Sequence, residues 1–180
     1  VSKTKPVSDI KKAYNSGQLI FGENKVQELV EKHNKLPKNI QWHMIGHLQT
    51  NKVKFIAPFV SLIHGVDSEK LLIEIDKRAK QNNRIIDCLL QVHITKESTK
   101  FGFSSEEIVE IIPKLESYKN VNIIGLMGMA TFTKNETQIK EEFSFLSDIY
   151  KKYKQMNTLS MGMSGDYKIA IDYGSTMIRI

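Results

Sequence analysis

The chain has 180 residues, with 26 Lys and Arg side chains against 20 Asp and Glu, a formal net charge of +6 at pH 7. Hydrophobic residues make up 41% and charged residues 26%, which is ordinary globular usage and excludes a disordered chain, a collagen-like repeat and a coiled-coil rod. The positive charge is spread over lysines on expected helix faces rather than gathered in a basic block, so nucleic-acid binding is not predicted.

Membrane insertion and disulfide bonding are not predicted either. The longest apolar stretch, Ile123 to Ala130, is interrupted by two glycines and is far shorter than the roughly 20 residues of a spanning helix. The single cysteine, Cys88, lies in an apolar run and is expected to be a buried thiol in a reducing, cytoplasmic setting. Because the chain opens on the apparent tail of one strand and stops inside another, we expect a fragment that lacks parts of both ends.

Hydrophobic periodicity alternates between 3.6 and two residues along the chain, which predicts alternating helices and strands. The predicted helices cover Val7 to Ser16, a segment from Val26 with Leu29 and Val30 on one face, Gln49 to Ala57, a segment capped by Asp67 or Ser68, a segment opened by a capping box at Ser104 and Glu107, Glu136 to Gln155, and Tyr167 to Tyr173. The predicted strands are Val1 to Lys3 as the end of a first strand, Leu19 to Phe21, Ile40 to Ile45, Val60 to Val66, Ile85 to Ile94, Val121 to Met127, Thr158 to Met161 and Met177 to Ile180.

Strictly alternating strands and helices require a parallel sheet with right-handed crossovers, and eight such units favour closure. The sequence therefore predicts an α/β fold, a (β/α)8 TIM-type barrel, with residues 1–180 as one domain. An open doubly wound sheet is the alternative. Complete barrels usually need about 250 residues, which agrees with missing material at the ends.

In such a barrel the functional face is built where strands end, so polar side chains there are the candidates. They are Lys3, Asn24, His43, Lys100, Ser164 and Arg179. A lysine near a barrel interior is costly to desolvate when charged and is often paired or used covalently, as in Schiff-base chemistry. The alternative for Lys3 is a solvent-exposed lysine near a frayed end.

The segment Gly162 to Asp166 follows a predicted strand and contains Ser164. The serine-hydrolase pattern G-x-S-x-G fails, because Asp166 stands at its last position. A hydroxyl and free backbone N–H groups at a helix start after the seventh strand favour a phosphate site. The alternative is that Ser164 only caps the helix that follows.

Metal and nucleotide chemistry have little support in the sequence. His43 and His47 are four residues apart, but the segment is predicted as a strand, where this spacing does not bring two ligands together. No CxxC, HExxH, GxxxxGK or GxGxxG pattern occurs.

Seven motifs, in order along the whole chain, resemble those of the pyridoxal phosphate homeostasis protein family, which is itself similar to the barrel domain of alanine racemase. They are Val1 to Lys5, Phe21 to Asn24, Trp42 to Gly46, Lys100 to Gly102, Gly125 to Met127, Gly162 to Asp166, and Gly174 to Ile180. The resemblance implies that Lys3 forms a Schiff base with pyridoxal 5′-phosphate. It also implies that Ser164 binds the phosphate and that Arg179 faces the pyridine nitrogen.

The same resemblance implies that Lys100 lies near the phenolic oxygen of the cofactor and that Asn24 and His43 line the pocket. An arginine at the ring nitrogen would leave that nitrogen unprotonated and weaken the cofactor as an electron sink. The family's strand-eight motif continues with a Gly and a small hydroxyl residue that complete the phosphate site, and this chain stops at Ile180. We expect no counterpart of the separate domain that gives alanine racemase its catalytic tyrosine.

The resemblance implies a cytoplasmic protein of cofactor homeostasis that stores or delivers pyridoxal phosphate without defined turnover. Pyridoxal-phosphate-dependent apoenzymes are the expected recipients, and we expect a monomer. The alternative is a true fold-type III enzyme, such as an amino-acid racemase or lyase. A phosphate-binding barrel enzyme without this cofactor would need paired carboxylates at strand ends, which the sequence does not show.

Overall fold

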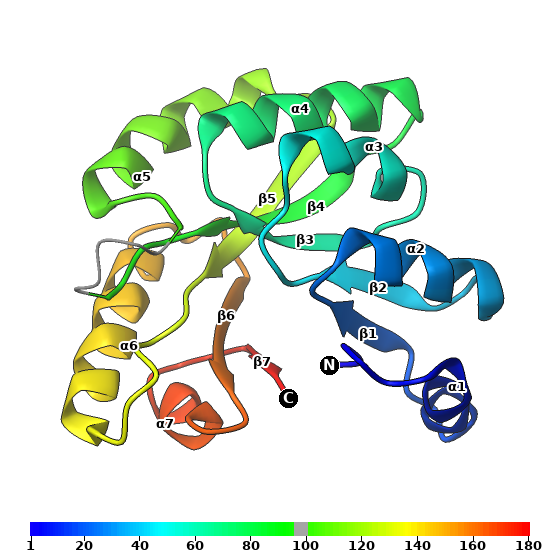
Figure 1. Ribbon diagram of the computed structural model, residues 1–180. Helices are drawn as coiled ribbons and strands as arrows, with labels where there is room; N and C mark the ends of the chain where they lie inside the picture. Colours follow the sequence, from blue (N-terminus) through cyan, green and yellow to red (C-terminus); the bar gives the residue numbers. More distant parts are fainter. Residues whose placement is uncertain (96–100) are drawn as a thin grey trace.

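The computed structural model describes residues 1–95 and 101–180, and Figure 1 shows strands curving around a common axis with helices outside them. Seven parallel strands form one sheet in the order β1-β2-β3-β4-β5-β6-β7. The strands are β1 (Ile20–Glu23), β2 (Gln41–Met44), β3 (Leu62–Val66), β4 (Ile86–Gln91), β5 (Val121–Met127), β6 (Thr158–Met163) and β7 (Met177–Arg179). The helices are α1 (Val7–Asn15), α2 (Val26–Lys35), η1 (Thr50–Lys52), α3 (Val53–Ile56), α4 (Glu69–Gln81), α5 (Ser105–Ile111), η2 (Ile112–Ser117), α6 (Glu136–Tyr150) and α7 (Tyr167–Asp172).

Each strand pairs with the next strand in the sequence, so the predicted TIM-type barrel is confirmed. An open doubly wound sheet would reverse its strand order at a switch point, and the observed order has no reversal. That alternative is therefore wrong. The sheet is nearly closed, and the two chain ends face each other across the remaining gap between β1 and β7 (Figure 1).

The prediction of a strand at Val1 to Lys3 is wrong, and the described residues contain seven strands rather than eight. The Ser2 N–H donates to the carbonyl oxygen of Gly22 at 2.9 Å, as a neighbouring strand would. The chain then turns, because the Lys5 N–H donates back to the Ser2 carbonyl oxygen at 3.1 Å. The amino group of Val1 contacts the carbonyl oxygen of Ile180, so the first residues lie in the gap between the two edge strands.

The core lies between the strands and the surrounding helices, as the apolar patterns predict. On α4 the predicted stripe of Leu71, Leu72, Ile75 and Ala79 is fully buried. Cys88 on β4 is buried, as predicted, and burial raises the pKa of its thiol. No helix among the described residues is long and apolar enough to cross a bilayer.

Two of the predicted helix caps are confirmed by side-chain hydrogen bonds to the first turn of the helix. Ser68 accepts from the Leu71 N–H at 3.4 Å, and Ser104 and Glu107 form the predicted capping box at the start of α5. These bonds satisfy N–H groups that have no partner within the helix, which fixes where each helix begins.

Candidate functional site

A hydrogen-bonded chain of four buried side chains crosses the inside of the barrel. The Arg179 Nη1 donates to the Ser160 Oγ at 2.7 Å. The Ser160 Oγ lies 3.1 Å from His64 Nδ1, and His64 Nε2 lies 3.1 Å from His43 Nδ1. The chain joins β7, β6, β3 and β2, so it connects the last strand to the first half of the barrel.

Burial keeps both imidazoles of this chain neutral. Burial lowers the pKa of His43 to about 4, and burial, followed by the neighbouring His43 and Arg179, holds the pKa of His64 well below its ordinary value. A guanidinium can only donate, so one consistent assignment has the Ser160 hydroxyl donating to His64 and the His64 Nε2–H donating to His43. Ser160 and His64 then each accept one hydrogen bond and donate one, while Arg179 only donates and His43 only accepts.

Arg179 is a buried cation without a carboxylate partner among the described residues. Its side chain is held by Ser160 and by the Gly128 carbonyl oxygen, which accepts from Nη2 at 3.0 Å. Burial lowers the pKa of Arg179 to about 10, an effect that the charge of Asp166 opposes, so the group stays charged at neutral pH. A guanidinium has five N–H groups and two of its nitrogens are engaged here, so it retains donors for an acceptor in the barrel.

A cavity of about 300 Å³ lies beside this chain, between the edge strands of the barrel. Arg179, His43 and His64 contribute to its wall, together with Val1 and Gly22. The remaining lining residues are Gln18, Ile20, Ile45, Met177, Ile178 and Ile180. The cavity combines an apolar lining with a single buried cation, an arrangement suited to a small aromatic ligand with a basic ring atom.

The turn after β6 places Ser164 next to the Arg179 strand. Met163 pairs with Arg179 in the β6–β7 register, and Ser164 follows directly. The Ser164 side chain is exposed and has no hydrogen-bond partner among the described residues. Asp166, which precedes α7, accepts from the Met163 N–H at 2.6 Å, so the reading of Ser164 as the helix cap is wrong.

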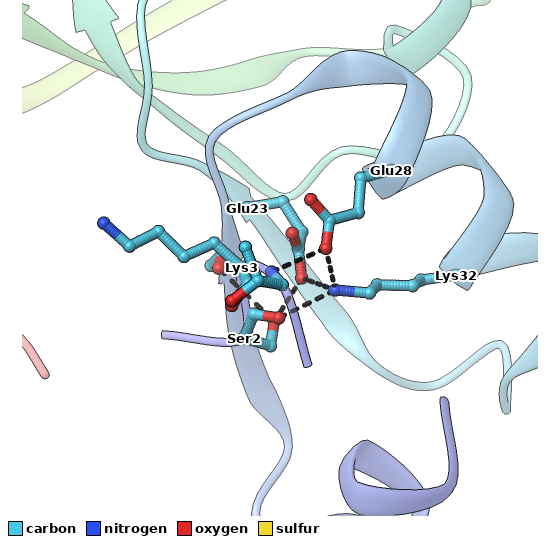
Figure 2. A network of polar contacts seen from close by, with 7 residues as sticks. Ser2, Lys3, Glu23, Glu28 and Lys32 are labelled. Carbon is cyan, nitrogen blue, oxygen red and sulfur yellow. Dashed lines mark hydrogen bonds and ion pairs between the residues drawn. The ribbon is translucent and has the colours of Figure 1, made fainter. Parts of the chain in front are cut away.

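Lys3 is exposed, and its amine has no partner among the described residues. The preceding Ser2 is buried and belongs to a polar network with Glu23, Glu28 and Lys32. Figure 2 shows the Lys3 side chain extending away from that network, with its amine far from the Lys32 amine. Lys3 is the first central residue of the turn that the Lys5 N–H closes on the Ser2 carbonyl oxygen, so its side chain leaves the chain at the turn while Ser2 is anchored below it.

Of the other three predicted site residues, one lies in the cavity wall, one is exposed and one lies outside the described residues. His43 joins the cavity wall, as described above. Asn24 follows β1 and is exposed, with no hydrogen bond from its side chain among the described residues. Lys100 lies outside the described residues, although Phe101, immediately after it, stacks on the ring of His47 at 3.9 Å between centroids. No cluster of metal ligands occurs in the described part of the chain.

Sequence reasoning missed His64 and Ser160 of the buried chain, and Glu23 and Lys32 of the polar network. His64 and Ser160 lie in strands buried on both faces, where a run of apolar residues does not show which side chains point inward. Lys32 had a usable signal, since it stands four residues after Glu28 on a helix and on the same face as Leu29. That signal does not reveal burial.

Comparison with known proteins defines the class of this barrel. The family described as alanine racemase, N-terminal domain, matches residues 6–180. The chain belongs to the pyridoxal phosphate homeostasis proteins within that class. It is 38% identical over 185 residues to the protein of that name from Aquifex aeolicus, covering 99% of this chain and 81% of the relative. The Helicobacter pylori J99 protein of the same name is 37% identical over 183 residues, covering 100% and 82%.

Solved structures agree with the sequence relatives. PipY of Synechococcus elongatus without PLP is 32% identical with a TM-score of 0.92, covering 99% of this chain and 86% of that one. The same protein with PLP bound gives 33% identity, a TM-score of 0.87 and the same coverage. An alanine racemase from Clostridium difficile 630 has a TM-score of 0.77 at 15% identity, covering 96% of this chain and 46% of that one, which shows a shared fold.

Proposed function

We propose that this chain holds pyridoxal 5′-phosphate in the barrel as a Schiff base on Lys3 and acts in cofactor homeostasis. Ser164 contributes a hydroxyl to the phosphate, and Arg179 donates to the pyridine nitrogen. His43 and Asn24 line the pocket, and Lys100 serves the phenolic oxygen. Residues 1–180 act together as one cofactor-binding domain.

Arg179 is the observation that carries the proposal. A guanidinium buried to 7% exposure, with no carboxylate within ion-pair distance among the described residues, calls for an acceptor to compensate its desolvation. The pyridine nitrogen is such an acceptor, and Ser164, one residue past the strand partner of Arg179, offers a free hydroxyl for the phosphate. PipY, the relative solved with PLP bound, supports the same ligand here.

Bound in this barrel, pyridoxal phosphate supplies an aldehyde carbon that forms a C=N bond with a primary amine, the aldehyde oxygen leaving as water. The residues of this chain then hold and shield that group rather than drive turnover. Arg179 retains its own proton, so it leaves the ring nitrogen unprotonated and limits stabilisation of a carbanion. We propose a non-catalytic carrier on this ground, and the names of the relatives support it.

The biological setting follows from the same chemistry. A carrier that holds a reactive aldehyde as an imine suits a monomer that passes the cofactor to pyridoxal-phosphate-dependent apoenzymes. The lone, buried Cys88 suits a reducing cytoplasm.

The Schiff base is tested directly by borohydride reduction and peptide mapping. In the wild-type protein incubated with pyridoxal phosphate, the reduced label is expected on Lys3, together with visible absorbance before reduction. Lys3→Ala should lose both signals, while Lys5→Ala, a substitution two residues away in the same turn, should keep them. A label on another lysine, or on none, would contradict the assignment.

A further inference from the structure

A buried polar network centred on the Lys32 amine lies beneath Lys3. The Lys32 amine donates to Glu23 Oε1 at 2.7 Å, to Glu28 Oε1 at 2.6 Å and to the Ser2 carbonyl oxygen at 2.7 Å. These are the three donors that an ammonium group possesses. The Lys32 side chain is 6% exposed and that of Glu23 is fully buried.

Three contacts attach the N-terminal segment to β1 and to α2. The Ser2 hydroxyl donates to Glu23 Oε1 at 2.5 Å, and the Lys32 amine donates to the Ser2 carbonyl oxygen at 2.7 Å. Glu28 accepts from the Thr4 N–H at 2.7 Å, so the residues on both sides of Lys3 are fixed by the same network. Figure 2 shows these contacts converging on one side of the segment and the Lys3 side chain leaving on the other.

The segment held in this way is conformationally unusual. Thr4 has a φ of 63°, a left-handed value that a β-branched residue adopts at a cost. The Lys5 N–H bonds to the Ser2 carbonyl oxygen, so Lys3 and Thr4 are the two central residues of a tight turn. Such a turn persists when contacts around it impose it, and the network supplies contacts at Ser2 and at Thr4.

Lys32 is the central member of the network. Glu23 Oε2 has no hydrogen-bond partner among the described residues, so Lys32 provides the charge that compensates this buried carboxylate. Lys32 also lies on the buried face of α2 with Val26 and Leu29, and that helix packs against the barrel as a fixed support. Contacts with the buried face of α2 therefore fix the position of the turn relative to the core.

We propose that Lys32, together with Glu23 and Glu28, is a positioning residue for Lys3: the network fixes the turn that presents the Lys3 amine and so sets its reactivity toward an aldehyde. The inference rests on the proposed function, because it concerns the amine assigned there to the Schiff base. It assigns Lys32 no contact with the cofactor. A misplaced reactive group commonly costs about 10- to 100-fold in rate, and that is the effect expected when the network is broken.

The test compares the rate at which visible absorbance develops after pyridoxal phosphate is added to the wild type and to two variants. Lys32→Met should slow the reaction by about 10- to 100-fold. Glu28→Ala removes the partly exposed acceptor of the Thr4 N–H but leaves the Lys32–Glu23 pair, so it should fold and show a smaller reduction of the same kind. Lys35→Met is the matched control, because Lys35 lies on the same helix and pairs with Glu31 at 2.6 Å on an exposed face. Its rate should stay within about twofold of the wild type.

Hydrogen exchange of the cofactor-free proteins gives a second measurement that does not depend on the cofactor. The Ser2 amide, bonded to Gly22, should exchange faster in Glu28→Ala than in the wild type or in Lys35→Met.

Borohydride mapping distinguishes failure of the proposed function from failure of the positioning role. A wild type labelled away from Lys3 overturns the proposed function and the positioning role with it. A wild type labelled on Lys3, with both network variants as fast as Lys35→Met and with unchanged Ser2 exchange, overturns the positioning role alone.

Discussion

At the scale of single residues, the barrel separates two kinds of buried charge. Lys32 is neutralised locally by Glu23 and Glu28, whereas Arg179 is held only by the neutral oxygens of Ser160 and Gly128. In the first arrangement the positive charge is balanced by carboxylates of the same network. The second keeps a positive potential inside the barrel that a ligand can use, because an uncompensated charge in a poorly solvated site interacts strongly with a suitable acceptor.

Ser164→Ala is expected to weaken pyridoxal phosphate binding without abolishing it. In the proposed site the hydroxyl is one of several donors to the phosphate, and the loss of one hydrogen bond to a charged group costs roughly 1.5–3 kcal/mol, or about 10- to 150-fold in affinity. Equilibrium titration of the full chain measures the loss. Pyridoxal, which lacks the phosphate, is the control ligand and should bind both proteins equally. Equal affinity for both ligands in both proteins would remove Ser164 from the site.

The His43–His64 pair predicts that the free energy of unfolding falls as the pH is lowered from 7 to 5. The unfolded chain protonates His43 below a pKa of about 6.5, whereas the folded protein resists protonation until about pH 4. Between these values the unfolded state binds more protons, so stability rises with pH and is lost on acidification. His43 alone should account for about 2 kcal/mol of that loss.

Urea unfolding at pH 7 and pH 5 measures this effect. The wild type should lose more stability between the two values than His43→Gln, which has no imidazole to protonate at that position. The His47→Gln variant, altered at an exposed histidine, should lose as much as the wild type. Equal losses in the wild type and in His43→Gln would show that His43 does not control acid stability.

At the scale of elements, the sequence predicts most helices and strands because buried side chains recur with the period of a helix or of a strand. The predicted bounds are wrong where an element ends in a turn. The helix predicted over Glu136 to Gln155 stops at Tyr150, yet Tyr153 still packs against the core from the turn that follows. Its apolar side chain extends the helical pattern although the backbone has already left the helix. The helix predicted over Gln49 to Ala57 divides into η1 and α3.

The candidate site is likewise predictable from the sequence only in part. Lys3, Ser164 and Arg179 stand out because motifs at strand ends mark them, whereas Glu23 and Lys32 are found only once α2 is packed against β1. A buried ion pair between a strand and a helix has no local signature, since its partners are nine residues apart on different elements. Its existence depends on tertiary packing rather than on sequence spacing.

The end of β6 and the turn that follows it carry a prediction about glycine. Gly162 has a φ of +95°, and an added Cβ would lie 2.6 Å from the Cβ of Ala170 and 3.0 Å from the Cα of Tyr167. Gly162→Ala should therefore destabilise the protein by about 2 kcal/mol or more, from backbone strain and overpacking together. Chemical denaturation measures this, with Gly165→Ala as the matched control in the same turn.

An added Cβ at Gly165 meets no atom within 4 Å, and its φ is not in the left-handed region. That variant should stay within about 0.5 kcal/mol of the wild type. Comparable losses in both variants would mean that the turn is sensitive to any side chain rather than to the close approach of α7.

At the scale of the whole molecule, the barrel brings distant parts of the chain to one place. The Val1 amino group contacts the Ile180 carbonyl oxygen, so the two ends of the described chain meet across the gap between β1 and β7 (Figure 1). Because strand order follows sequence order, this juxtaposition depends on every intervening unit.

At the same scale, we expect the cofactor-loaded protein to exchange the α-proton of amino acids only at trace rates, because the barrel interior provides neither a strong electron sink nor a suitable base. Arg179 stays protonated at neutral pH, and in the proposed site it would leave the ring nitrogen without a proton, which weakens the electron sink. The buried imidazoles are weak bases, because burial lowers the pKa of His43 to about 4 and that of His64 well below its ordinary value. A well-placed acid or base usually contributes about 10²–10⁴-fold, and neither imidazole is suited to supply it.

Deuterium exchange at the α-carbon of alanine, followed by NMR, tests this expectation in the loaded protein, with Lys3→Ala as the control. The expected rate lies far below the roughly 1–10³ s⁻¹ of ordinary enzymes. His43→Gln should leave the trace rate unchanged, since the prediction gives that imidazole no part in proton transfer. Exchange at ordinary enzyme rates that disappears in Lys3→Ala would overturn the carrier assignment and identify a racemase-like enzyme instead. A loss of that exchange in His43→Gln would then identify His43 as its base.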